Sequence, residues 1–148
     1  MSETSDSPDK LSVVVYDANF DKVHYALVLA SGAAAIGRPV TLFFTMLACK
    51  ALMKPGADGR PGWADMPLSD TPGNGEARDA AYAERKVATF EELLEASAAM
   101  GVRFLVCEMG LRAHGLARGD LRDDVPIEEG GVVTFLTDAS KDGAVVFI

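Results

Sequence analysis

The sequence has few cysteines, no long apolar run and no surplus of basic residues, and each absence excludes a class of protein. Its 148 residues include only two cysteines, Cys49 and Cys107, which are too few for the disulfide framework of a small secreted domain. The longest uncharged stretch, residues 25–37, is far shorter than the roughly 20 apolar residues that a membrane-spanning helix needs. We therefore expect no membrane span.

Basic residues are outnumbered by acidic ones, 14 to 22, which gives a formal net charge of -8 at pH 7. Nucleic-acid binding depends on clustered Lys and Arg, but the arginines between residues 112 and 122 are interleaved with aspartates. We expect no nucleic-acid partner. The polar opening MSETSDSPDK lacks the charged-then-apolar order of a secretion signal, so we expect residues 1–10 to form a disordered tail of a cytoplasmic protein.

Motifs for nucleotides and metals are also missing. Neither GxGxxG nor GxxxxGK followed by Ser or Thr occurs, so a nucleotide-dependent enzyme has no support. The two cysteines do not match the ligand spacing of a zinc site with either histidine. We expect neither a cofactor nor a bound metal, and we expect His24 and His114 to be ordinary, partly exposed helix residues.

What the sequence does contain is an alternation of short apolar runs and helical patterns. Strands are predicted at residues 11–17, 39–45, 102–107 and 144–148, with a short extended piece at 125–127. Helices are predicted at residues 20–37, 46–54, 82–100, from 108 onward, and at about 132–140. This order predicts one α/β domain over residues 11–148, with a five-stranded, mainly parallel, flavodoxin-like sheet and helices on both faces.

Residues 54–80 interrupt this alternation with four prolines and five glycines. A connection of this length inside a small domain is usually a lid, a binding loop or a disordered segment. We expect it either to fold over the edge of the sheet that carries Cys107 or to pack on a neighbouring subunit.

The strongest functional signal is the stretch VRFLVCEMGLRAHGL at residues 102–116, where an apolar strand ends on Cys107 and a helical pattern begins at once. Such a junction places the thiol beside free helix N–H groups, which favour a thiolate. The negative charge of Glu108 acts against a thiolate because it raises the pKa of the neighbouring thiol. Arg112 lies one helical turn further on and can pair with Glu108, which cancels part of this effect. A buried, inert cysteine is the alternative.

Further candidates follow from the predicted sheet, because ligands of such sheets collect at the carboxyl ends of the strands. The weak candidates for binding a substrate or an anion are Asn19 and Thr45 after the first and second strands, Arg112 after Cys107, and Gly130 with Gly131 before an apolar helix. The two glycines could present backbone N–H groups to an anion such as a persulfide or sulfite, with a plain turn as the alternative. Asp17 and Asn19 are also expected to cap the first helix.

Cys49 is a second candidate thiol, in the helical segment that follows the second strand. In the flavodoxin-like strand order the second strand lies at an edge, which would separate Cys49 from Cys107 by more than the roughly 7 Å that a disulfide spans between Cα atoms. We therefore expect Cys49 to be a packing residue, with a redox pair of the two cysteines as the alternative.

From residue 11 to 148 the chain resembles the DsrE/DsrF-like sulfur-relay family, most of all its peroxiredoxin-like branch. The segments that carry the resemblance are CEMGLRAHGL at 107–116, FFT at 43–45 and EGGV at 129–132. MLAC at 46–49 and the long excursion with Trp63 depart from the pattern.

The resemblance implies a persulfide carrier or sulfurtransferase-like relay protein that accepts sulfur on Cys107. Its partners would be sulfur-donor and sulfur-acceptor proteins. The alternatives are a non-catalytic oligomeric scaffold or small-ligand-binding protein and, third, a thiol oxidoreductase that uses Cys49.

The first helix predicts self-association. Residues 25–36 are apolar around the whole helix, with only Ser31 and Gly32 as breaks. A helix of this kind is covered by its own sheet and by something else. We therefore expect a homo-oligomer.

Overall fold

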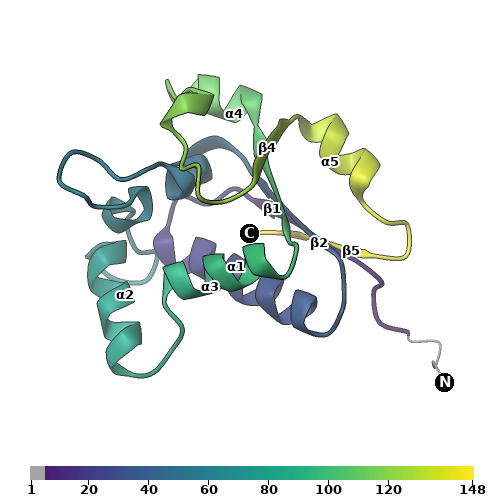
Figure 1. Cartoon of the computed structure of the whole chain (residues 1–148), viewed down its shortest axis with the longest axis horizontal. Helices are drawn as coiled ribbons and strands as arrows, with labels where there is room; N and C mark the ends of the chain where they lie inside the picture. Colours follow the sequence, from purple (N-terminus) through teal and green to yellow (C-terminus); the bar gives the residue numbers. More distant parts are fainter. Residues whose placement is uncertain (1–5) are drawn as a thin grey trace.

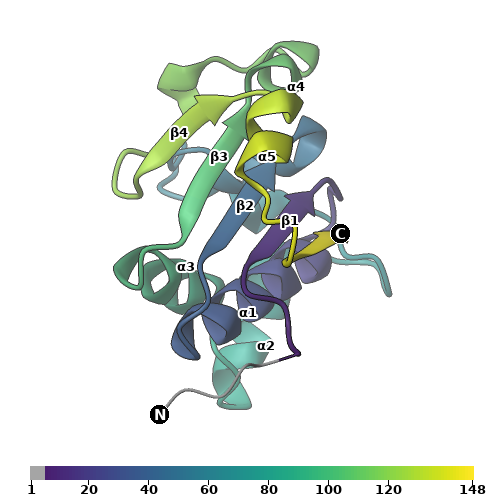
Figure 2. The same ribbon diagram turned by 90° about the vertical axis from the view of Figure 1, so that its right-hand side faces the viewer.

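The computed structural model describes residues 6–148. Its five strands form one parallel sheet in the order β4-β3-β2-β1-β5, which Figure 2 shows face-on. The strands are β1 (Leu11–Val15), β2 (Val40–Phe44), β3 (Arg103–Cys107), β4 (Ile127–Gly130) and β5 (Ala144–Phe147). The predicted α/β class is confirmed.

Helices cover both faces of the sheet (Figure 1). The α-helices are α1 (Phe20–Ala35), α2 (Gly75–Glu84), α3 (Phe90–Ala99), α4 (Glu108–Ala113) and α5 (Val132–Asp138). Three short 3₁₀ helices are η1 (Met46–Leu52), η2 (Gly62–Asp65) and η3 (Arg118–Asp120). α1 packs against α3 on one face of the sheet, whereas α5 lies alone on the opposite face (Figure 1).

The two faces of the sheet have cores of unequal size, because successive strand residues point to opposite sides. The larger core lies under α1 and α3 and includes Val13, Phe44 and Phe104. The smaller core lies under α5 and consists of Phe43, Leu105, Cys107 and Phe135, with Val14 packed against it. The cysteine of interest therefore belongs to the thinner layer.

The expected edge position of the second strand is wrong, because β2 lies between β1 and β3. Its sequence VTLFF explains the position, since all five residues are buried and a central parallel strand is covered on both faces. The true edge strands β4 and β5 are partly exposed along their length. As a result the segments that follow β2 and β3, with Cys49 and Cys107, begin at neighbouring strand ends.

The helix predicted at residues 82–100 is two helices, α2 and α3. Lys86 adopts a positive φ of 61° between them, and Thr89 begins α3 with a capping box in which its side chain and that of Glu92 bond each other's backbone N–H. The spacing of Thr89 and Glu92, Thr-x-x-Glu, is a sequence signature of the start of a helix. Two smaller differences are that residues 46–52 form a 3₁₀ helix, and that β4 extends to Gly130.

The excursion at residues 54–80 does not cover Cys107. Trp63 and Met66 are buried in the larger core, and the Trp63 ring stacks on Phe90 with 5.0 Å between ring centroids. The indole nitrogen of Trp63 donates a hydrogen bond to Glu91 on α3 at 2.7 Å. The excursion is thus an ordered cover for α1 and α3, on the face opposite the Cys107 cluster.

α1 is covered in large part by the same chain. The sheet lies on one side, and α3, α2 and η1 contact other parts of the helix, while Tyr25 stays 55% exposed. None of the described helices is long and apolar enough to cross a membrane.

The expected N-terminal tail lies partly outside the described residues. Of the described part, the backbone N–H of Asp9 donates to the carbonyl of Asp142 at 3.2 Å, and Lys10 is ion-paired with Asp138 at 2.8 Å.

Candidate functional site

Cys107 is the last residue of β3 and the N-cap of α4. The strand places its side chain on the face of the sheet that α5 covers, among Phe43, Leu105 and Phe135. Only 3% of the residue is exposed. The thiol is therefore positioned at the carboxyl edge of the sheet, as predicted, but it is closed off from solvent.

Two attachments hold α5 over this thiol. Phe135 is the only buried residue of α5, and its ring stacks on Phe43 with 5.1 Å between centroids. At the other end of the helix, Asp138 accepts hydrogen bonds from Lys10 at 2.8 Å and Thr41 at 2.6 Å, and pairs with Arg103 at 2.9 Å. The helix that covers Cys107 is thus held in place by one aromatic side chain, Phe135, and one carboxylate, Asp138.

The pKa of Asp138 reflects its partners. Burial by itself would raise the pKa of this carboxyl, but the hydrogen bonds from Lys10 and Thr41 and the charges of Lys10 and Arg103 outweigh burial and lower it. Asp138 is therefore ionised at neutral pH, which keeps the end of α5 bound to the sheet.

The ends of neighbouring strands surround Cys107 as the sequence predicts. Thr45 follows β2 and is buried, and Gly130 is the residue of β4 paired with Cys107. Gly110, in the first turn of α4, also belongs to this region and was not predicted. A Cβ at Gly110 would lie 2.5 Å from the backbone nitrogen of Met46, so only glycine lets α4 pack this closely on η1.

Close packing also accounts for Gly130. A Cβ at this position would lie 2.7 Å from Cδ1 of Leu105, whereas one at Gly131 would meet nothing within 4 Å. The N–H of Gly131 donates to Oγ1 of Thr134 at 3.4 Å. The glycine pair is thus the end of a strand and the start of α5, and its geometry favours the packing interpretation over a preformed anion site.

Asn19 and Arg112 have partners of their own. Asn19 takes the expected N-cap position of α1, but its side chain makes no capping bond and donates instead to Asp17 at 2.7 Å. Arg112 pairs with Glu108 at 3.3 Å, as expected from their spacing. Both side chains of this pair are largely exposed, which makes the interaction weak.

Cys49 is fully buried in the larger core, and its thiol donates to the carbonyl of Phe44 at 3.6 Å. Burial raises the pKa of Cys49 to about 12, and the electrostatic interaction with Cys107 acts in the same direction. Both cysteines are free. Cys49 is a neutral thiol at physiological pH and therefore a poor nucleophile, so the structure leaves Cys107 as the better candidate.

The histidines do not assemble a metal site. Nε2 of His24 lies 2.9 Å from the carbonyl of Ala88, and its ring packs on Tyr82 with 4.6 Å between centroids. His24 is buried, so its expected partial exposure is wrong. Within residues 6–148 no three His, Cys, Asp or Glu side chains are grouped so that they could hold a metal ion.

Comparison with known families agrees with this architecture. The sequence matches the DsrE/DsrF/DrsH-like family over residues 7–61 and 71–147. The protein belongs to this family. The unmatched residues 62–70 include η2 and the buried Trp63, so the match leaves out part of the excursion that covers α1 and α3.

Relatives of this DsrE-like protein span almost its whole length. The uncharacterized protein YrkE of Bacillus subtilis (strain 168) is 30% identical over 156 residues, which covers 94% of this chain and 96% of YrkE. Two solved structures share the fold at low identity. MTH1491 of Methanobacterium thermoautotrophicum, a protein of unknown function, has a TM-score of 0.59 at 13% identity, with coverage of 94% and 98%. The ychN protein of E. coli has a TM-score of 0.55 at 17% identity, with coverage of 95% and 99%.

Proposed function

We propose that this DsrE-like protein is a persulfide carrier, or a sulfurtransferase-like relay protein, that holds sulfur on Cys107. The observation that carries the proposal is the position of this thiol at the end of β3 and the start of α4, at the edge of the parallel sheet where ligands of such folds collect. Cys49 is a weak competitor because its pKa is raised to about 12.

The transfer consists of two balanced exchange steps. The Cys107 thiolate attacks the outer sulfur of a donor persulfide, the donor S–S bond breaks, and the donor thiolate leaves with the electron pair of that bond. Cys107 then carries the persulfide. An acceptor thiolate attacks the outer sulfur in turn and releases the Cys107 thiolate, so no net oxidation or reduction of the carrier occurs.

Access requires movement of α5, since Cys107 is only 3% exposed. α5 contributes one buried side chain, Phe135, to the cluster around the thiol, so a short displacement of this helix would expose the sulfur. We infer that the donor and acceptor proteins bind at α5 and open it. The two free thiols fit a reducing compartment such as the cytoplasm.

An intact-mass measurement tests the relay. The wild-type protein and the Cys107→Ser and Cys49→Ser variants are exposed to an inorganic polysulfide and then to dithiothreitol. We expect a reducible adduct of single sulfur atoms on the wild type and on Cys49→Ser, and none on Cys107→Ser. Equal loading of Cys107→Ser, confirmed folded by circular dichroism, would refute the assignment.

The burial of Cys107 favours a second candidate, a non-catalytic scaffold in which this residue only packs. That candidate predicts no sulfur adduct on the native wild type. A thiol oxidoreductase that uses Cys49 is disfavoured by the raised pKa of that thiol.

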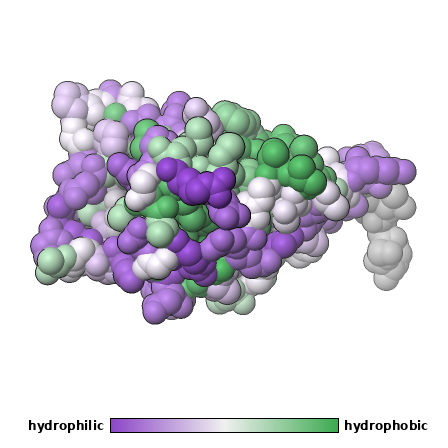
Figure 3. Space-filling model, turned by 90° about the horizontal axis from the view of Figure 1, so that it is seen from above, coloured by the Kyte–Doolittle hydropathy of each residue, from purple (hydrophilic) through white to green (hydrophobic). Residues whose placement is uncertain are grey.

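A homo-oligomer remains part of the proposal, although the sheet, α2, α3 and η1 already cover much of α1. The support is the exposed apolar surface formed by β5 and Tyr16, which includes Val145 and Phe147. The neighbouring apolar surface over α5, which includes Val132, Val133 and Leu136 (Figure 3), is left for the donor and acceptor proteins. Phe147 is 66% exposed and packs on Tyr16 at 5.4 Å. Light scattering should show an oligomer that Phe147→Asp dissociates, and a monomeric wild type at micromolar concentration would refute this part.

A further inference from the structure

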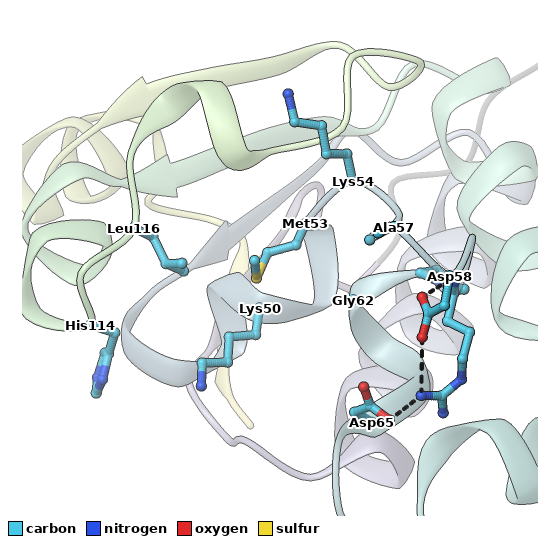
Figure 4. A pocket seen from close by; sticks show the side chains of 12 residues that line it. Lys50, Met53, Lys54, Ala57, Asp58, Gly62, Asp65, His114 and Leu116 are labelled. Carbon is cyan, nitrogen blue, oxygen red and sulfur yellow. Dashed lines mark hydrogen bonds and ion pairs between the residues drawn. The ribbon is translucent and has the colours of Figure 1, made fainter.

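A hollow of about 690 Å³ lies at the carboxyl end of the sheet (Figure 4). None of its lining residues belongs to the cluster around Cys107. Its walls come from the end of η1, from the excursion at residues 56–62, and from the residues that end and follow α4. Small-molecule sites in proteins commonly have volumes of a few hundred to about 1,000 Å³. The hollow is therefore large enough for a metabolite-sized ligand.

Hydrogen bonds and ion pairs fix these walls. The backbone N–H of Lys54 donates to the carbonyl of Asp120 at 3.0 Å, next to an antiparallel bridge between Met53 and Leu121. Across the hollow, Arg60 is ion-paired with Asp65 at 2.6 Å and with Glu76 at 3.2 Å. Because these contacts already order the walls, binding of a ligand would not lose free energy to the ordering of flexible loops.

Three basic side chains line the hollow without an acidic partner. Lys50, Lys54 and His114 form no ion pair or side-chain hydrogen bond with the residues that the structure describes. Arg60, which lies across the hollow, differs from them because its charge is met by three carboxylates. In a chain of net charge -8, three unmatched basic groups around one hollow favour an anionic occupant.

The floor between these basic groups is apolar. Met53 and Leu116 are half-buried there, and Figure 4 shows them between Lys54 on one side and Lys50 with His114 on the other. An apolar body placed on this floor would carry its anionic group toward one of the flanking ammonium groups. A combination of apolar walls with a few polar groups is typical of small-molecule sites.

We propose that this hollow binds a small organic anion, a carboxylate, sulfonate or phosphate ester with an apolar body. Met53 and Leu116 contact the body, while the anionic group pairs either with Lys54 on one side of the floor or with Lys50 and His114 on the other. The proposal does not depend on sulfur transfer, because none of the lining residues is a cysteine.

The test uses 1-naphthyl phosphate as the probe and ¹H–¹⁵N NMR titration of the full chain as the measurement. The neutral 1-naphthol and inorganic phosphate are compared with it, since each has only one half of the proposed ligand. The variant Lys50→Gln/Lys54→Gln removes the two ammonium groups of the hollow. The variant Lys86→Gln/Lys141→Gln is the control, because it removes two exposed lysines elsewhere and has the same net charge.

We expect saturable shifts confined to residues near 50–62 and 114–116, with 1-naphthyl phosphate binding more tightly than either partial compound. We also expect Lys50→Gln/Lys54→Gln to weaken binding about tenfold and the control variant less than about twofold, as for two partly solvated ion pairs. Each of four results would overturn the proposal: no saturable binding, equal weakening in both variants, shifts centred on α5 and β5, or either partial compound binding as tightly as the probe.

Discussion

Phe135 controls access to Cys107 if α5 is the cover that opens. Replacing Phe135 by Leu removes the stacking on Phe43 and leaves a small gap in the cluster around the thiol. The lost aromatic pair and the gap together cost about 2 kcal/mol. Because 1.4 kcal/mol is a factor of ten, the open population of α5 should rise about 30-fold.

The assay is the rate at which iodoacetamide alkylates each cysteine under native conditions, followed by peptide mass spectrometry. Phe90→Leu is the matched control. Phe90 is fully buried in the larger core and stacks on Trp63 at 5.0 Å, so its loss lowers global stability by a similar amount without touching α5. Cys49, buried in the same larger core, reports on global unfolding.

We expect Phe135→Leu to accelerate alkylation of Cys107 about 30-fold. Phe90→Leu should accelerate alkylation of Cys49 and leave that of Cys107 within about threefold of the wild type. If Phe90→Leu accelerated Cys107 as much as Phe135→Leu does, Cys107 would be reached by global unfolding, and the role of α5 as a cover would be refuted.

Three further predictions concern other parts of the molecule. Cys49→Ala should keep sulfur loading unchanged by intact mass, because Cys49 with a pKa of about 12 is not the nucleophile; loss of loading would contradict this. Gly130→Ala should lower the free energy of unfolding, measured by urea denaturation, by about 1–3 kcal/mol because its Cβ clashes with Leu105. Gly131→Ala should change the same quantity by less than about 0.5 kcal/mol, and equal effects of the two variants would disprove the packing account. Glu91→Gln should cost about 1 kcal/mol at pH 7 in urea unfolding, since hydrogen bonds from Arg122 lower the Glu91 pKa below its usual range. Because the pKa of Glu91 is lower in the folded state, the pair stabilises the protein above the ordinary glutamate pKa, and this stability is lost as the pH falls through the folded pKa. The difference in free energy of unfolding between Glu91→Gln and the wild type should therefore shrink toward pH 3. A difference that stays constant with pH would contradict this account.

The strands were readable from the sequence because each is a short apolar run, and their alternation with helices determined the sheet type. The position of β2 was read wrongly because it was taken from a flavodoxin-like strand order and not from its own residues. VTLFF has no polar residue other than Thr41, and such a run is typical of a central strand. The break between α2 and α3 was likewise present as the capping signal at Thr89 and Glu92.

The candidate site was predictable in part. The place of Cys107 follows from local pattern, since a strand that ends on a residue and a helix that begins there define a junction. Its burial does not, because Phe135 lies 28 residues further along the chain and reaches the thiol only once the sheet is assembled. The hollow beside η1 was missed for the same reason: Lys50 and His114 come together only because β2 and β3 are neighbours.

Asp138 gives the protein a route for control of its thiol from a distance. α5 follows Gly131, whose neighbour Gly130 is paired with Cys107, and ends on Asp138. Asp138 binds Lys10 and Thr41, which lie at the amino ends of β1 and β2, whereas Cys107 lies at the carboxyl end of β3. A seven-residue helix is about 10 Å long, so an event at the amino ends of the strands bears on the reactivity of a cysteine at their carboxyl ends. Replacing Lys10 by Ala, which removes one of the partners of Asp138, is therefore expected to raise the alkylation rate of Cys107.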